Sequence, residues 1–220
     1  MKTWILSDIH GHHDLLKIPE VDTVIIAGDV TNSFILYRNE QEFFSFKNWL
    51  FDLPIKNKVL IAGNHDAYAT KKYNIDDLKT NGIIYLEHEY VEIENKLIFG
   101  SPYTPTFGNW YFNVNRNKLQ KYWEGLEGPI HILVTHGPPK GILDLTLNRE
   151  DKLEMCGDKA LLNKVLELRP KIHVFGHIHN FKQCINQGIR EYQGIKFINA
   201  SIVEDGKFGN ITNNGIIIDI

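Results

Sequence analysis

Five apolar runs in this chain are each followed, within two residues, by glycine or aspartate. The runs are four or five residues long and occupy 3–7 (TWILS), 23–27 (TVIIA), 58–62 (KVLIA), 131–135 (HILVT) and 172–175 (IHVF). Near-continuous apolar runs of this length are typical of strands that are covered on both faces, although a buried helical turn gives a similar run. The glycine and aspartate residues that follow favour a strand leading into a turn. The pattern therefore predicts buried strands that end in polar loops.

The loops after these runs carry side chains that bind metal ions. Their motifs are Asp8-Ile9-His10, Gly28-Asp29, Gly63-Asn64-His65-Asp66, Thr135-His136-Gly137 and Gly176-His177-Ile178-His179. In open α/β sheets, binding sites form at the carboxyl ends of strands, where loops from distant parts of the chain converge. Carboxylates, imidazoles and one amide suit Mn, Fe, Zn or Ni rather than Cu(I) or an iron–sulfur cluster. We therefore expect the five loops to form one transition-metal site.

The order of the five motifs resembles that of the calcineurin-like metallophosphoesterase superfamily, and the match extends from Asp8 to His179. A closer resemblance is to the MPPED (metallophosphoesterase domain-containing) branch. It rests on further stretches at 101–105 (SPYTP), 110–113 (WYFN, before Arg116), 133–139 (LVTHGPP), 173–179 (HVFGHIH) and 198–201 (INAS). The resemblance implies an α/β fold (an α+β sandwich) in which two packed mixed β-sheets are flanked by helices. It also implies weak, metal-dependent hydrolysis of phosphodiesters, including cyclic nucleotides.

The resemblance also implies two divalent metal ions, of which manganese is the expected one, with Fe, Zn, Ni and Co as alternatives. One ion is assigned Asp8, His10, Asp29 and His179, and the other is assigned Asp29, Asn64, His136 and His177. Asp29 bridges in this assignment because a carboxylate has two oxygens and a negative charge. Two ions roughly 3.5–4 Å apart lower the pKa of a water that they share, so that hydroxide attacks phosphorus near neutral pH.

Residues next to the expected ligands suggest a proton donor and substrate contacts. His65 stands one residue from Asn64 and is assigned the proton that the departing alkoxide needs. Asp66 is expected to orient His65, with a turn or helix-capping role as the alternative. Three further residues are candidates for substrate contacts, namely His12, His13 and Arg116. The alternatives for these three are solvated histidines and an arginine that caps an aromatic cluster.

Four functions are compatible with these motifs. The one we favour is a phosphodiesterase acting on a small phosphoester, such as a nucleotide. The second is a phosphomonoesterase or protein phosphatase, but the protein-phosphatase subfamily carries an arginine shortly after Gly-Asp, and Val30, Thr31 and Asn32 follow Asp29 here. The third is a nuclease, which would need a basic track lined by aromatic residues, whereas the lysines are scattered. The fourth is a non-catalytic scaffold, which would have lost ligands, and none is missing.

The composition is that of an ordinary globular protein. A chain of 220 residues buries an ample core, and no linker or repeat divides it, so we expect a single domain over 1–220. The net charge of -3 gives no basic field for an extended nucleic acid. Two cysteines are too few for a disulfide scaffold, and the N-terminus shows no signal-peptide region, which favours a cytoplasmic protein. No apolar run approaches the roughly 20 residues that span a bilayer.

Helices and hairpins are expected between and after the strands. Two segments have helical periodicity and stop before a proline, namely Gln41–Leu53 and Asp158–Leu168. Two hairpins are expected, at Val91–Ile93 with Leu97–Phe99 and at Arg190–Tyr192 with Lys196–Ile198. Loops 101–115 and 141–151 are expected to decide which substrate fits, and their shapes do not follow from the sequence.

Overall fold

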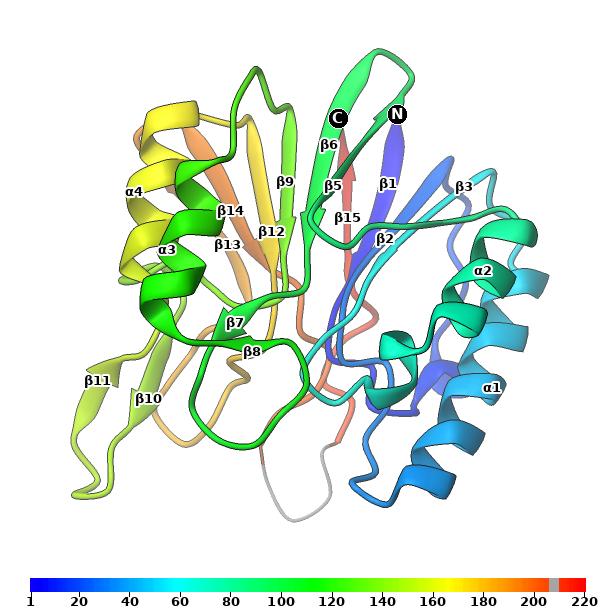
Figure 1. Ribbon diagram of the computed structural model, residues 1–220, viewed down its shortest axis with the longest axis horizontal. Coiled ribbons are helices and arrows are strands. Elements are labelled where there is room, and N and C mark those ends of the chain that lie inside the picture. The colour runs from blue at the N-terminus through cyan, green and yellow to red at the C-terminus, as the bar shows by residue number, and fades with distance from the viewer. Residues whose placement is uncertain (206–209) are drawn as a thin grey trace.

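In the computed structural model, which describes residues 1–205 and 210–220, two β-sheets pack face to face and helices cover their outer faces (Figure 1). This arrangement confirms the predicted α/β class with two packed mixed sheets flanked by helices. All five predicted strands are present, each within one residue of its predicted bounds. Three of them lie in the first sheet and two in the second, so the motifs reach the centre of the molecule from both sheets.

The first sheet holds the amino-terminal strands and one strand from the end of the chain. Its order is β15-β1-β2-β3-β4. The strands are β1 Lys2–Leu6, β2 Thr23–Ala27, β3 Asn57–Ile61, β4 Ile83–Tyr85 and β15 Ile216–Asp219. Strands β1 to β4 are parallel, and β15 runs antiparallel to β1. Because β1, β2 and β3 are parallel, the three motifs that follow them lie at the same edge of the sheet.

The second sheet has four parallel strands with an antiparallel strand at each edge. Its order is β13-β14-β12-β9-β6-β5. The strands are β5 Glu89–Ile93, β6 Lys96–Ser101, β9 Ile132–Thr135, β12 Ile172–Phe175, β13 Gly188–Tyr192 and β14 Ile195–Asn199. The antiparallel pairs β5–β6 and β13–β14 are the two predicted hairpins. Two smaller pairs lie outside this sheet, β7 Thr104–Pro105 with β8 Asn113–Val114 and β10 Leu145–Leu147 with β11 Leu153–Met155.

Helices form the outer layers of the sandwich (Figure 1). Those over the first sheet are α1 Leu36–Asp52 and α2 Lys72–Thr80, and those over the second are α3 Arg116–Glu124 and α4 Lys159–Leu168. Two single 3₁₀ turns, η1 His13–Leu15 and η2 Ala67–Thr70, follow the first and third motifs. No helix within 1–205 and 210–220 is both long and apolar enough to cross a membrane.

The strands are apolar on both faces because each face packs against a different layer. In β1, Ile5 belongs to the core between the two sheets, whereas Trp4 and Leu6 belong to the core beneath α1. Phe175 of β12 faces the third core, beneath α3 and α4. Neighbouring side chains of a strand point to opposite faces. The near-continuous apolar runs in the sequence are therefore explained by burial on both sides.

The structure corrects the predicted helix bounds at their amino-terminal ends. The helix predicted over Gln41–Leu53 begins earlier, at Leu36, and ends at Asp52. Its first turn has little apolar periodicity because it is exposed, with Leu36 56% accessible. The helix predicted from Asp158 begins at Lys159, since Asp158 is the residue before the helix and its carboxylate accepts a hydrogen bond from Ala160 N.

The carboxyl ends of the two sheets are joined directly. A parallel bridge pairs Ser7, after β1, with Ser201, after β14, and Ser7 N donates to Ala200 O at 2.9 Å. Within the second sheet, Gly176 N donates to His136 O at 2.9 Å. The loops that carry the five motifs therefore gather at one shared edge, which is the lower edge in Figure 1.

Candidate metal centre

The shared edge brings histidine and aspartate side chains from both sheets within reach of one another. The groups whose potential ligand atoms lie within 4.8 Å of each other are Asp8, His10 and His179, then Asp29, His136 and His177, and an overlapping set of His10, Asp29 and His65. Asp29 belongs to two of these groups. The spatial arrangement therefore matches that of two neighbouring ions with one shared carboxylate.

The first group contains two imidazole nitrogens that lack a hydrogen-bond partner. His179 Nε2 lies 3.0 Å from Asp8 Oδ1, and His10 Nε2 lies 4.0 Å from Asp29 Oδ2. Both nitrogens are buried, yet neither makes an aligned hydrogen bond with any described residue. A buried polar atom without a partner is costly. A cation among these atoms would satisfy both nitrogens, so the first group fits a metal ion.

The second group adds the amide of Asn64. His136 Nε2 lies 3.3 Å from Asp29 Oδ2 and 3.0 Å from Asn64 Oδ1, and all three side chains are buried. The His177 ring lies beside the His136 ring, with 4.9 Å between their centroids. Nitrogen and oxygen donors that converge in this way suit a divalent transition-metal ion.

Hydrogen bonds on the far side of three rings determine which nitrogen faces the centre. The Nδ1 atoms of His136 and His10 lie 2.8 Å and 3.0 Å from backbone carbonyl oxygens. A carbonyl oxygen only accepts, so Nδ1 donates its proton there and Nε2 faces the centre. The Nδ1 atom of His179 makes a similar contact of 2.6 Å with Asp205 Oδ1. Such outer partners orient the rings of metal-binding histidines.

Burial and neighbouring carboxylates act in opposite directions on the histidine pKa values. Burial lowers the pKa of His136, but Asp29 more than offsets it, and the pKa is raised to about 9. At His179, burial is likewise outweighed by Asp8, and the pKa is raised to about 10. Burial prevails at His177, whose pKa is lowered to about 3. The carboxylates thus favour the protonated forms of His136 and His179, and a metal ion would compete with those protons on binding.

Four of the expected ligands have a left-handed backbone, which residues other than glycine rarely adopt. The angle φ is 54° at Asp8, 45° at His10, 53° at Asp29 and 68° at His177. Each such conformation costs about 1–3 kcal/mol and persists only where the surrounding structure imposes it. The backbone at these four positions is thus held in a conformation that directs the side chains toward the cluster.

Two motif glycines leave space for the carboxylates. A Cβ atom at Gly63 would overlap the carboxylate of Asp29, and a Cβ atom at Gly176 would overlap that of Asp8. Any larger residue at either position would displace an expected ligand. This close approach explains why glycine begins the third and fifth motifs.

His65 lies beside the cluster, but Asp66 does not contact its ring. The half-buried His65 ring is 4.7 Å from the His10 ring between centroids, and its Nδ1 lies 3.0 Å from a backbone carbonyl oxygen. Asp66 is buried and accepts hydrogen bonds from N and Oγ1 of Thr31 and from N of Gly63. The described hydrogen bonds of the Asp66 carboxylate do not include the His65 ring, and the orienting role of Asp66 stays a prediction. This carboxylate ties the loop after β3 to the loop after β2.

The three candidate substrate contacts lie in different surroundings. His13 is buried under α1, with its Nε2 2.9 Å from Ser45 Oγ, and a substrate contact by His13 stays a prediction. His12 is half-buried before η1 and lines neither of the cavities beside the cluster. Arg116 begins α3 and lines a cavity that also borders His177. Substrate contacts by Arg116 and by His12 both stay predictions.

Among the residues that the structure describes, two cavities beside the cluster differ in character. One, of about 440 Å³, borders His65 and is lined by aromatic, aliphatic and amide side chains, including Trp110. The other, of about 540 Å³, borders His177 and contains two cationic side chains, Arg116 and Lys140. A molecule bound at the cluster and reaching into both cavities would therefore contact aromatic and amide side chains beside His65 and charged side chains beside His177.

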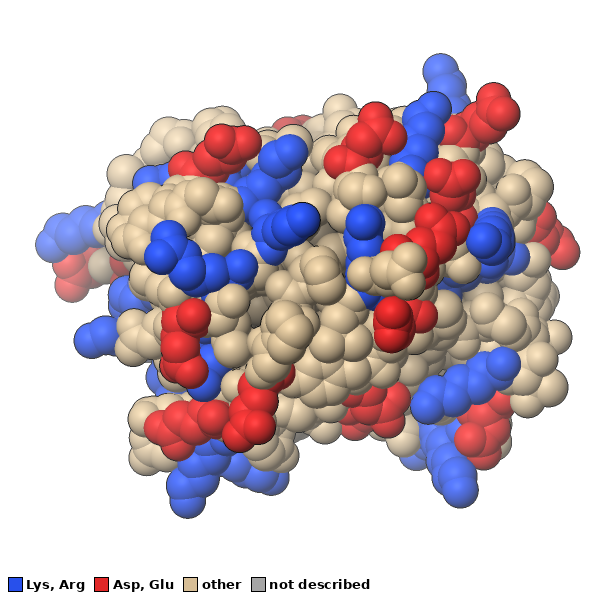
Figure 2. All heavy atoms as spheres, turned by 90° about the horizontal axis from the view of Figure 1, so that it is seen from above, with Lys and Arg blue, Asp and Glu red and all other residues tan. Residues whose placement is uncertain are grey.

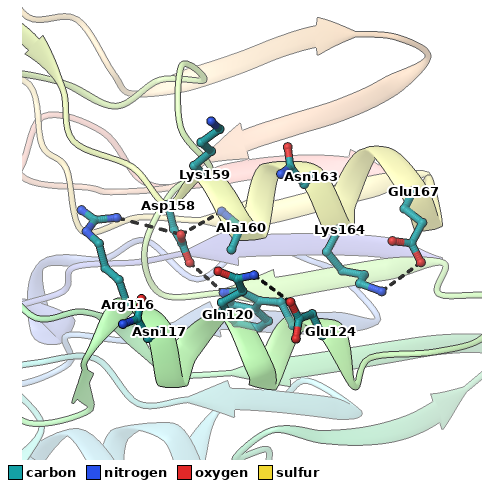
Figure 3. A pocket seen from close by; sticks show the side chains of 11 residues that line it. Arg116, Asn117, Gln120, Glu124, Asp158, Lys159, Ala160, Asn163, Lys164 and Glu167 are labelled. Carbon is teal, nitrogen blue, oxygen red and sulfur yellow. Dashed lines mark hydrogen bonds and ion pairs between the residues drawn. The ribbon is translucent and has the colours of Figure 1, made fainter.

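A third cavity, of about 490 Å³, lies between α3 and α4 (Figure 3), and none of the candidate ligands lines it. Asp158 accepts a hydrogen bond there from Trp123 Nε1 at 2.7 Å and lies 4.0 Å from Arg116 Nη1. Arg116 lines both this cavity and the one beside His177. Arg116, whose side chain is more than half exposed, is therefore the residue through which this region adjoins the cavity beside His177.

Two residues at the centre were missed by sequence reasoning. Asp205 bonds to His179 from 26 residues further along the chain, and no local pattern indicates that pairing. Phe34 stacks near His65, with 5.4 Å between ring centroids. The sequence feature that could have indicated Phe34 as a site residue is its place in the loop directly after the Gly28-Asp29 motif, where it is an aromatic residue.

Comparisons with known proteins agree with the arrangement of this site. A family model described as calcineurin-like phosphoesterase matches residues 1–181. Metallophosphoesterase domain-containing protein 1 of Homo sapiens and that of Mus musculus are each 32% identical to this chain over 223 residues. The match covers 90% of this chain but 64% of either relative, so the chain spans less than two thirds of their length.

Solved structures share the fold at low sequence identity. The phosphopantetheinyl hydrolase of Mycobacterium tuberculosis has a TM-score of 0.59 at 17% identity, covering 91% of this chain and 89% of that one. TT1561 of Thermus thermophilus has a TM-score of 0.60 at 11% identity, covering 91% and 88%. These likenesses concern the fold alone. Since the family model covers most of the chain, and the five motifs within it form a single cluster, this chain belongs to the calcineurin-like phosphoesterase family.

Proposed function

We propose that the protein is a phosphodiesterase that hydrolyses small phosphodiesters, cyclic nucleotides among them, and that it uses two divalent metal ions, with manganese as the expected metal. The observation that carries this proposal is the convergence of carboxylates and imidazoles at one edge, where the buried Nε2 atoms of His10 and His179 make no aligned hydrogen bond with a described residue. Such a cluster is expensive to maintain unless a cation completes it.

The expected ligands divide between the two ions around Asp29. One ion would be held by Asp8, His10, Asp29 and His179, and the other by Asp29, Asn64, His136 and His177. When bound, the ions would supply positive charge for the phosphoryl oxygens and a water of lowered pKa. The chain itself supplies rings that are held by their outward hydrogen bonds and backbone that is already shaped for binding.

His65 is proposed to protonate the leaving oxygen. Its Nδ1 donates to Asn32 O at 3.0 Å, so Nε2 is the nitrogen from which a proton can be given to a substrate. Its backbone N donates to Asp29 Oδ1 at 2.7 Å, which ties the donor to the expected bridging ligand. A departing alkoxide at the cluster would therefore find a proton donor in the loop after β3, next to the expected ligand Asn64.

The surroundings of His65 support a diester over a monoester. A phosphate monoester carries more negative charge than a diester near neutral pH and gains more from a guanidinium or ammonium partner. No lysine or arginine is among the described residues that line the cavity beside His65. Arg116 and Lys140 line the cavity beside His177, and this observation keeps a phosphomonoesterase, such as a protein phosphatase, as the second candidate.

A nuclease has less support than either candidate. Figure 2 shows the face at the amino ends of the parallel strands, which lies opposite the cluster, and basic and acidic side chains are interspersed on it. The net charge of -3 adds no general attraction for a polyanion. Binding along a nucleic acid relies on a basic track. We therefore propose a small substrate.

We also propose that residues 1–220 form one domain in a reducing compartment such as the cytoplasm. Side chains from both sheets share one core between them, which supports a single folding unit. Cys156 and Cys184 are both free thiols, as is usual where glutathione keeps cysteines reduced.

A substrate panel tests the proposed function. The Mn²⁺-loaded protein would be assayed with 2′,3′- and 3′,5′-cyclic nucleotides, an aryl phosphodiester, an aryl phosphomonoester and single-stranded DNA. We expect the cyclic nucleotides and the aryl diester to be turned over faster than the monoester and the DNA. Faster hydrolysis of the monoester would favour the second candidate, and faster hydrolysis of DNA would favour a nuclease. Absence of turnover on every substrate would leave the scaffold alternative.

A further inference from the structure

Three aromatic side chains form a continuous surface beside the metal-ligand cluster. We call Phe34, Phe107 and Trp110 the aromatic wall. Phe34 and Trp110 lie 4.7 Å apart between ring centroids, and Phe107 and Trp110 lie 6.0 Å apart. Phe34 is 73% exposed and Phe107 is 54% exposed. Adjoining exposed rings of this kind mark a binding surface more often than scattered apolar residues do.

The aromatic wall is continuous with the candidate centre. Trp110 lies 4.5 Å and Phe34 5.4 Å from the ring of His65, between centroids. At its other end, Phe107 lies 5.1 Å from the ring of His177. The wall therefore contacts both the proposed proton donor and an expected ligand, so a substrate at the cluster would lie against it.

Whereas Phe107 lines the neighbouring cavity beside His177, the cavity in front of Phe34 and Trp110 suits an uncharged planar group. Its described lining residues include Phe34, Leu36, Trp110 and Tyr111, together with two amides and a serine, but no lysine, arginine, aspartate or glutamate. Its volume of about 440 Å³ lies within the range of small-molecule sites, which combine apolar walls with a few polar groups. Aromatic walls bind bases through stacking, which depends little on the identity of the base.

Backbone hydrogen bonds fix the wall relative to the cluster. The segment between β7 and β8, which carries Phe107 and Trp110, is closed by bonds from Thr104 N to Phe112 O and from Thr106 N to Val114 O. Tyr111 N donates to Asn64 O at 3.3 Å, which links the segment to an expected ligand. Figure 1 shows this segment at the lower edge, where the motif loops gather.

We infer that the aromatic wall stacks a planar ring, such as a nucleobase, that belongs to the leaving alcohol of the phosphodiester and brings its leaving oxygen to His65. The inference rests on the proposed function. In the reaction, a water oxygen bonds to phosphorus, the bond from phosphorus to the leaving oxygen breaks, and that oxygen takes a proton from His65. Trp110 and Phe34 contact His65, which places the ring on the leaving side, whereas the cavity beside His177 is lined by Arg116, Lys140 and Glu154 together with Phe107. The wall therefore determines which of two ester bonds is cleaved.

The test uses a diester with two chemically similar leaving groups. Adenosine 5′-methyl phosphate gives adenosine and methyl phosphate if the nucleoside leaves, or adenosine monophosphate and methanol if methanol leaves. We expect the Mn²⁺-loaded protein to release mainly adenosine, as measured by chromatography of the products. In Phe34→Leu and Trp110→Leu, which keep apolar bulk but remove a ring, this preference should be lost. Tyr192→Leu, which removes a half-exposed ring on the edge strand β13, should keep it.

A binding measurement separates this inference from the proposed function. By calorimetry, adenosine 5′-methyl phosphate should bind the Mn²⁺-loaded protein about ten-fold more tightly than dimethyl phosphate, through base stacking. The advantage should disappear in Trp110→Leu and persist in Tyr192→Leu. If no diester is hydrolysed but this difference is found, the proposed activity is wrong and the wall still binds a ring. Equal affinities of the two diesters, methanol as the main leaving group, or a preference that survives in both wall variants would overturn the inference.

Discussion

Asp29→Ala should lower turnover by more than about 100-fold. The loss should be this large because Asp29 is itself an expected ligand, whereas removing a residue that only hydrogen-bonds to a ligand costs roughly 10–100-fold. Asp29 Oδ2 lies 3.3 Å from His136 Nε2 and 4.0 Å from His10 Nε2, so this carboxylate reaches histidines of both groups. Burial acts to raise its pKa, but His136 and the other histidines nearby outweigh this and hold the pKa well below its usual range. Removing Asp29 therefore removes a negative charge that both ions would share.

Asn64→Ala is the matched comparison for Asp29→Ala. Asn64 is also buried, but its amide is neutral and contacts the second group through His136. Asn64→Ala should therefore lose less turnover and less bound metal than Asp29→Ala. Elemental analysis gives the metal content, and circular dichroism shows whether each variant is folded. Equal metal content in Asp29→Ala and the parent protein would show that Asp29 is not a ligand.

His65→Ala should retain both ions yet lower kcat by roughly 10²–10⁴ on a diester with an alkyl leaving group. An alkoxide departs badly without a proton, whereas p-nitrophenolate is a stable anion and needs the proton far less. The loss should therefore shrink markedly on an aryl phosphodiester. Because the imidazole has its Nδ1 on a backbone carbonyl and borders an open cavity, its removal should disturb the fold little.

His136→Ala separates proton donation from metal binding. His136 is buried and contacts both Asp29 and Asn64, so its removal should impair both substrates alike and lower the metal content. The measurement is kcat on the two substrates alongside elemental analysis of each variant. If His65→Ala is equally impaired on both leaving groups while its metal content is intact, His65 is not the proton donor, and it positions the substrate instead.

The strands and the clustering of the motifs could be predicted because both follow from local patterns. An apolar run that is buried on both faces and then meets glycine or aspartate is visible within a few residues, as at β2 and Gly28-Asp29. Parallel pairing then places such ends at one edge. Strand β15 was not predicted, because its apolar run of three isoleucines is shorter than the other runs and its partner β1 lies at the other end of the chain.

The roles of individual polar residues could not be predicted to the same extent, because they depend on contacts between distant loops. Asp66 follows His65 in sequence, yet its carboxylate turns toward Thr31 and Gly63 N–H groups. His13 follows the first motif closely but turns under α1. The aromatic wall joins Phe34 to a segment about 70 residues away, and such side-by-side placement has no sequence periodicity. Residues of these kinds are found by structure rather than by motif.

Removal and return of metal is the most direct test of the central claim that this cluster is a two-ion hydrolytic centre. The chelated protein should lose turnover of an aryl phosphodiester, and Mn²⁺ should restore it as two ions bind per chain, measured by titration with elemental analysis. The chelated protein should stay folded, since its three apolar cores do not involve the ligands, but with a lower Tm because ligand linkage is lost. Full turnover by metal-free protein would contradict the account.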